Sequence, residues 1–186
     1  AVNQAFDSIW NKSATIETIE LAIISLTYGI NSLPKIIDNQ FNKKERYYMF
    51  LTSLCSGVCI AKTKTSICHS ISYPLTSYFE VPHGLACVFT MNAVLKMIYS
   101  SKNNIAKKTC KDVDEFWLKH NKFNLLDSID IFVKKMKVSL LLKKYINNID
   151  DLMDIKNEMF TPGRIDNFII PVNISDIEKI LRDSWV

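Results

Sequence analysis

Apolar residues recur at helical spacing along almost the whole chain. In residues 1–11, Val2, Ala5, Phe6 and Ile9 occupy the i, i+3, i+4 and i+7 positions that line one face of a helix. The pattern therefore predicts a first helix that buries this face, and it continues in the same period through the segments that follow.

Two longer helices are expected next. Ser13 is a candidate N-cap for a helix that runs to about residue 31, and Pro34 then starts a new turn or kinks the helix. The second stretch, residues 43–62, is strongly apolar in "YYMFLTSLCSGVCIA". Gly57 lies inside this stretch, and a glycine there predicts the close approach of another backbone.

The middle of the chain is its most apolar part. Residues 84–99, "GLACVFTMNAVLKMIY", are apolar nearly all round, which predicts one central buried helix. Later segments are shorter, and the last has Ser175 as a candidate cap and a buried face of Ile177, Ile180 and Leu181. Because no alternating strand pair or Asn-Gly hairpin occurs, the pattern predicts an all-α helical bundle.

Composition narrows the class of protein. The 186 residues are 48% hydrophobic, enough for one core, so we expect a single domain over residues 1–186. The net charge of +4 comes from scattered lysines without a basic stripe, which argues against nucleic-acid binding. No apolar run has the length of a membrane span. Four separate glycines form no phosphate-binding loop. Five cysteines without disulfide-scaffold spacing indicate reduced thiols and a cytoplasmic protein.

The beginning of the chain, "AVNQAFDSIW", has no initiating Met, and apolar residues follow the helical period from the first residues on. A natural domain start usually has a cap or a polar lead-in. We therefore expect a fragment or a processed product.

Two of the three histidines lie in the apolar stretch "HSISYPLTSYFEVPHG". His69 falls in a helical segment that Pro74 kinks or ends, whereas His83 follows Pro82, which holds its approach extended. Gly84 then allows a tight turn into the buried helix. Two imidazoles brought together from separate segments could form a metal site. Single histidines in apolar helices are more often satisfied core residues, and the His-x13-His spacing alone fixes no geometry.

Other chemically active residues have weaker patterns. Cys55 and Cys59 share a helix face at i, i+4, yet two thiols without a second pair are a weak zinc signal, and buried cysteines usually act as small hydrophobes. His120 lies among polar neighbours and is expected to be solvated.

The stretch "KTKTSICHSISYPLTSYFEVPHGLACVF" closely resembles the signature of the iron-containing (group III) alcohol dehydrogenases, which share a fold group with dehydroquinate synthase and glycerol dehydrogenase. The resemblance implies the C-terminal helical domain of that fold, and it places two ligands of the catalytic divalent metal on His69 and His83. The two ends of the chain, "AVNQAFDSIWNKSATIETIELAIISL" and "GRIDNFIIPVNISDIEKILRDS", are similar to the family's first helix and C-terminal end.

The resemblance also implies further site residues. The family's aspartate ligand would lie one position before Ala1, and its next histidine ligand aligns with Gln4, whose carbonyl oxygen can serve a hard cation. Tyr73 stands where many members carry another histidine, so it is a possible substrate-contacting residue or simply a core aromatic. Asp7 occupies an acidic position suited to a hydrogen bond that orients a ligand. Gln4 and the local sequence are typical of a branch with phosphonoacetaldehyde reductases and octulosonate oxidases.

The implied reaction is hydride transfer between a small alcohol or aldehyde and NAD(P), with Fe or Zn as Lewis acid. The dinucleotide would lie mainly on an N-terminal α/β domain absent from this chain, so we expect the chain alone to be inactive. Two alternatives remain open: a catalytically degenerate helical interaction module, and a dehydroquinate synthase-like lyase domain. Apolar helices that face another domain in the family could also support a homo-oligomer.

Overall fold

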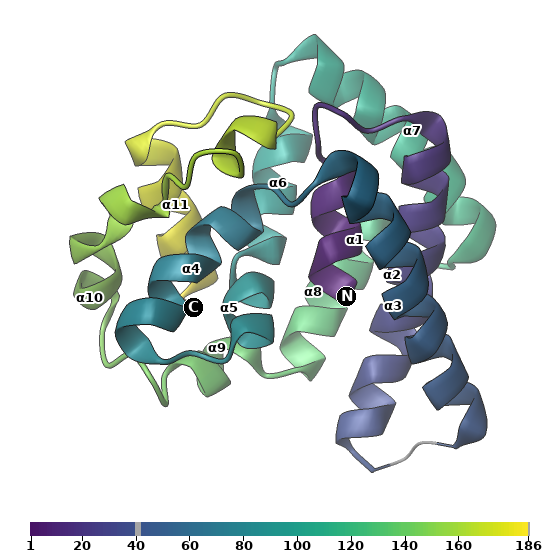
Figure 1. Ribbon diagram of the computed structural model, residues 1–186, viewed down its shortest axis with the longest axis horizontal. Helices are drawn as coiled ribbons and strands as arrows, with labels where there is room; N and C mark the ends of the chain where they lie inside the picture. The colour runs from purple at the N-terminus through teal and green to yellow at the C-terminus, as the bar shows by residue number, and fades with distance from the viewer. Residues whose placement is uncertain (40–41, 186) are drawn as a thin grey trace.

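The computed structural model of the protein describes residues 1–39 and 42–185, and within these ranges it contains helices and no strand (Figure 1). The predicted all-α class is confirmed. The helices in chain order are α1 (Val2–Ile9), α2 (Ile16–Ile37), α3 (Lys43–Thr63), α4 (Ile67–Phe79), α5 (His83–Phe89), α6 (Met91–Ser100), α7 (Asn104–His120), α8 (Leu125–Lys135), α9 (Val138–Leu142), α10 (Ile149–Asp154), the short 3-10 helices η1 (Lys156–Met159) and η2 (Ile165–Asn167), and α11 (Ile174–Ser184).

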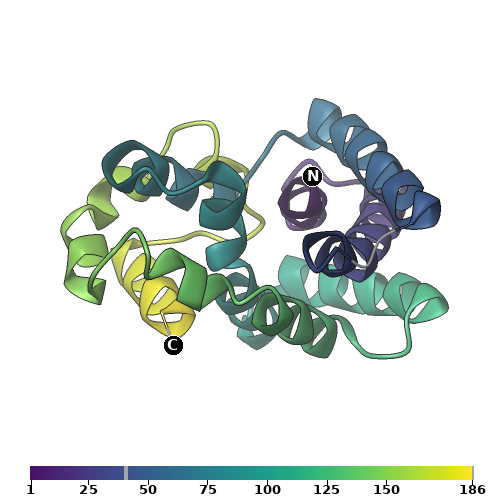
Figure 2. The same cartoon turned by 90° about the horizontal axis from the view of Figure 1, so that it is seen from below.

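The short helix α1 is the centre of the fold. It lies between the α2–α3 pair on one side and α4 and α5 on the other (Figures 1 and 2). Its predicted apolar face is buried, with Ala5, Phe6 and Ile9 fully covered. Its opposite face is buried too, although it carries Asn3 and Asp7. Buried polar groups need partners, and those of α1 find theirs around the two histidines.

Helices α2 and α3 pack closely against each other and against α1. A hydrogen bond of 2.8 Å from Ser25 Oγ to the carbonyl oxygen of Thr52 joins them. The close approach predicted at Gly57 is wrong, since no neighbouring helix of the described chain comes within 4 Å of where its Cβ would lie. The crowded glycine is Gly29, where a Cβ would meet Val2 Cγ2 at 2.7 Å and Thr52 Cγ2 at 3.0 Å. The sequence shows that each glycine lies inside a helix, but it does not show which face of that helix a neighbouring helix covers.

The bounds of α2 differ from the prediction at both ends. Thr15 is the N-cap in a capping box with Thr18, whereas the backbone N–H of Ser13 donates to Asn11 Oδ1 in the preceding turn. The helix also continues through Pro34 to Ile37 instead of ending near residue 31. A proline near the end of a helix removes only one hydrogen bond, and the packing of α2 on α3 maintains the last turns.

The expected single helix over residues 84–99 is two helices, α5 and α6, that break at Thr90. The predicted burial is confirmed for one face of each helix, but α5 begins with the exposed residues His83 and Gly84. The expected turn at Gly84 is also wrong, because this residue lies within α5. The chain instead leaves α4 through Glu80 in the left-handed conformation, and Pro82, with φ −52° and ψ 127°, leads into α5.

The last helix, α11, packs against α6 and α10. Its N-cap is Asn173, in a capping box with Asp176, and not Ser175. Both residue types are good caps, so the choice depends on where the chain enters the helix. Its predicted buried face is confirmed at Ile177, Ile180 and Leu181.

No single helix within residues 1–39 and 42–185 is both long enough and apolar enough to cross a membrane. The segments His83–Ser100 and Asn104–His120 satisfy the length and hydropathy criteria only when taken together, and they are bent by 113°.

The two helical glycines make a matched pair for a stability test. Gly29→Ala should destabilise the protein by about 1–2 kcal/mol, because overpacking costs ~1–3 kcal/mol and improved helix propensity offsets only part of it. Gly57→Ala meets no neighbour and should stabilise by about 0.5–1 kcal/mol. Urea unfolding of both variants measures the two changes, and equal shifts in the same direction would contradict the packing at Gly29.

Candidate metal centre

His69 is fixed by a buried carboxylate from another helix. Its Nδ1 lies 2.7 Å from Asp7 Oδ2, and the same oxygen accepts the backbone N–H groups of Ser66 at 2.8 Å and His69 at 3.3 Å. Ser66 is the N-cap of α4 but makes no side-chain cap bond, so Asp7 caps this helix from α1. Because Nδ1–H donates to the carboxylate, Nε2 is the ring nitrogen that can bind a metal ion once the imidazole is neutral.

His83 meets His69 from the first turn of α5. The two ring centroids are 5.4 Å apart at an interplanar angle of 61°. His83 is exposed and His69 is buried, so the pair joins a fixed imidazole to one that solvent can reach. The structure therefore brings together the two residues that the sequence separates by thirteen positions.

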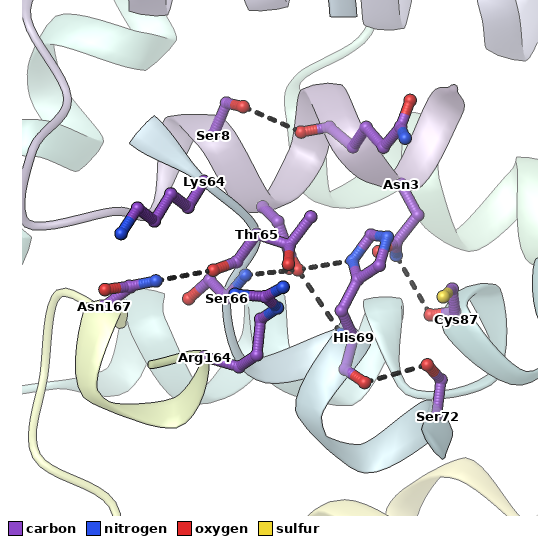
Figure 3. Close-up of polar contacts among 12 residues, drawn as sticks. Asn3, Ser8, Lys64, Thr65, Ser66, His69, Ser72, Cys87, Arg164 and Asn167 are labelled. Atoms are coloured by element: carbon purple, nitrogen blue, oxygen red, sulfur yellow. Dashed lines mark hydrogen bonds and ion pairs between the residues drawn. The ribbon is translucent and has the colours of Figure 1, made fainter. Parts of the chain in front are cut away.

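A third donor, Cys87, stands beside the two histidines and was not singled out from the sequence. Its Sγ lies 3.6 Å from His83 Nε2 and 3.8 Å from His83 Nδ1. One donor atom each from His69, His83 and Cys87 lie within 4.8 Å of one another. The backbone carbonyl of Cys87 accepts a 2.9 Å hydrogen bond from Asn3 Nδ2, which ties α5 to α1 (Figure 3). The signal available in sequence was the i, i+4 spacing from His83, which places both side chains on one helix face.

The site opens into a cavity of about 620 Å³. The polar residues in its wall include His69, His83 and Gln4, and most of the rest of the lining is apolar, from α2, α5, α8 and α9. Gln4 thus faces the same space as the histidines, although its Oε1 accepts a hydrogen bond of 3.3 Å from Ser56 Oγ.

Tyr73 lies beside His83. Its ring is stacked on that imidazole with centroids 6.2 Å apart and planes 8° apart. Its hydroxyl accepts a 3.2 Å hydrogen bond from Arg164 Nε. Tyr73 thus supports the orientation of His83, and its hydroxyl is already engaged.

The close contacts alter the proton affinities of the donors. Burial lowers the pKa of His69, but the hydrogen bonds with Asp7 and Cys87 outweigh it and raise the value to about 10. Burial raises the pKa of the Cys87 thiol, but the hydrogen bonds with His69 and His83 bring it down to about 7. The hydrogen bond with Cys87 raises the pKa of His83. Without a metal, the cluster favours positive imidazole beside negative sulfur.

The donor set suits a borderline divalent cation, because imidazole and thiolate are ligands of zinc and of ferrous iron. Asn3 Oδ1 and Asp7 Oδ1 are also buried beside the site with no hydrogen-bond partner among the described residues. The remaining candidates lie in other environments. Burial raises the pKa of the Cys59 thiol to about 11, and His120 is exposed at the end of α7.

The arrangement of helices and the paired histidines define a known class of protein. A sequence model described as the Fe-containing alcohol dehydrogenase family, C-terminal, matches residues 1–185. This chain belongs to the iron-containing alcohol dehydrogenase family, whose C-terminal helical domain it forms.

Particular relatives agree with this assignment. The phosphonoacetaldehyde reductase of Streptomyces viridochromogenes is 31% identical over 96 residues, which are 52% of this chain and 24% of that protein. The iron-containing alcohol dehydrogenase of Thermotoga maritima has a TM-score of 0.77 at 22% identity, covering 99% of this chain and 46% of that one. The sulfoacetaldehyde reductase of Bifidobacterium kashiwanohense, solved with NAD+, has a TM-score of 0.74 at 16% identity, covering 99% and 48%. The chain spans about half the length of these solved structures.

The contact between Asp7 and His69 predicts a pH-dependent contribution to stability in the metal-free protein. The folded-state pKa of His69, about 10, lies above its ordinary value of 6.5. The stabilisation is therefore fully present below pH 6.5 and is lost as the pH rises through about 10. Asp7→Asn should cost about 3 kcal/mol or more near pH 6, because it leaves a buried imidazolium unpaired.

The cost of Asp7→Asn should shrink steadily between pH 6.5 and 10. Urea unfolding of wild type and variant in a chelating buffer, at three pH values across this window, measures the difference. A cost that stays constant or grows with pH would contradict the ion pair.

Proposed function

We propose that this chain is the metal-binding helical domain of an NAD(P)-linked alcohol dehydrogenase or aldehyde reductase. The observation that carries the proposal is the convergence of His69 and His83, from two separate helices, with the buried carboxylate of Asp7 orienting the first. Family membership makes an oxidoreductase the expected class of enzyme.

Each residue has a distinct role in this proposal. His69 and His83 hold a divalent cation, Fe or Zn, and Gln4 offers a carbonyl oxygen from the same cavity wall. Asp7 accepts the Nδ1–H of His69 and is a positioning residue. When bound, the cation supplies Lewis-acid polarisation of a carbonyl or alcohol oxygen.

The cavity supports a small aldehyde or alcohol as substrate. It opens at the exposed imidazole of His83, and its largely apolar wall excludes water from a bound molecule. The names of two relatives refer to phosphonoacetaldehyde and sulfoacetaldehyde, so a short aldehyde with an anionic group is the first substrate class to test. The nicotinamide cofactor would bind mainly to the part of the family's length that this chain does not span.

A second candidate function is a helical interaction module. One face of α3 carries the exposed apolar side chains of Tyr47, Phe50, Leu54 and Val58. An exposed apolar stripe of this kind is typical of a surface covered by another protein segment or by a second copy of the chain. The same surface is expected in a domain that packs against the rest of an enzyme.

Metal content distinguishes these functions. The purified chain should hold close to one Fe or Zn per molecule, measured by elemental mass spectrometry after incubation with either ion and desalting. The double variant His69→Ala/His83→Ala should lose at least ~10-fold of the bound metal, since both imidazole ligands are removed. His120→Ala is the matched control, because the third histidine is exposed on α7 and its loss should change nothing.

Equal metal in all three proteins, or none in the folded wild type, would contradict the metal-binding role. The isolated chain is further expected to catalyse no oxidation of NADH by short aldehydes. If the isolated wild-type chain oxidises NADH and the double variant does not, the residues that bind the cofactor would lie on this chain.

A further inference from the structure

We propose that Cys87 is a third protein ligand of the cation held by His69 and His83, which makes the centre a His2Cys site. The inference rests on the proposed metal-binding function and adds a ligand type to it. Coordination forms a bond from the Cys87 sulfur to the metal, and the proton that Cys87 and the histidines hold in the metal-free cluster leaves to solvent.

The separation of sulfur and nitrogen fits a shared metal ion. With Zn–S near 2.3 Å and Zn–N near 2.0–2.1 Å, two such donors at a tetrahedral angle lie about 3.6 Å apart. The distance from Cys87 Sγ to His83 Nε2 is 3.6 Å. The i, i+4 spacing within α5 holds this pair on one helix face, so it does not depend on a loop.

His69 is the third donor of the site, and one of its two ring nitrogens already has a hydrogen-bond partner. Its Nδ1 is bound to Asp7, which leaves Nε2 as its ligand atom. The donor atoms of all three residues fall within 4.8 Å of one another. A single ion at ordinary bond lengths can therefore reach the three donors with small side-chain adjustments.

The surroundings of Cys87 differ from those of Cys59, which is also buried. Its side chain is buried, and Asn3 fixes its backbone at the wall of the cavity. By contrast, the Cys59 thiol donates to the carbonyl oxygen of Thr18, 3.5 Å away. A thiolate ligand would favour zinc or another thiophilic ion over magnesium, calcium or manganese, so Cys87 would set the metal preference of the centre.

Cobalt(II) reports thiolate ligation directly in its absorption spectrum, independently of catalysis. The metal-free chain is titrated with CoCl₂ under reducing, oxygen-free conditions. We expect one cobalt per chain, with an intense sulfur-to-cobalt charge-transfer band in the near ultraviolet and the visible bands of a tetrahedral ion. Cys87→Ser should lack the charge-transfer band and bind cobalt at least ~10-fold more weakly. Cys110→Ser, in α7, is the matched control and should retain both.

The outcomes separate this inference from the proposed function. Wild type that binds cobalt without the charge-transfer band, or Cys87→Ser that retains it, would overturn the thiolate ligand while the two-histidine centre stands. Absence of cobalt binding by the folded wild type would overturn both. Circular dichroism of the metal-free variants checks folding, and Cys87→Ala replaces the serine variant if a buried hydroxyl prevents it.

Discussion

The carboxylate of Asp7 is buried at the middle of the molecule, and one of its oxygens accepts hydrogen bonds from three N–H groups of residues 66–69. A buried charge is tolerated only where it is paired and hydrogen-bonded. Here the pairing fixes α1 against the N-terminus of α4 and sets the tautomer of His69. The position of the candidate metal centre and the junction of these helices therefore depend on the same interaction.

The rest of the centre is supported by the helices around α1. Asn3, one turn before Asp7, holds the backbone of Cys87, while Pro82 leads the chain into α5 so that His83 begins that helix. Tyr73 stacks against His83 from α4. Donors on packed helices keep their geometry better than donors on loops.

The family resemblance and the periodicity together anticipated much of this arrangement. The apolar face of α1, the all-helical class and the buried face of α11 follow from spacing alone, and His69 and His83 were found from the Pro-His-Gly segment. The wrong predictions of helix caps concern single residues near the helix starts. Ser13 and Ser175 were chosen as caps although Thr15 and Asn173 perform that role, because several good capping residues lie within two positions of each helix start.

Sequence by itself determined the helical period, the burial of apolar faces and the residue types that can bind a cation, since these depend on local spacing and side-chain chemistry. Only the tertiary structure decided that Gly29 and not Gly57 is crowded, that Gln4 contacts Ser56, and that Cys87 joins the histidines. Each of these depends on which face of a helix meets a neighbour distant in the chain. That choice is made by packing of the whole core, which no short stretch of sequence encodes.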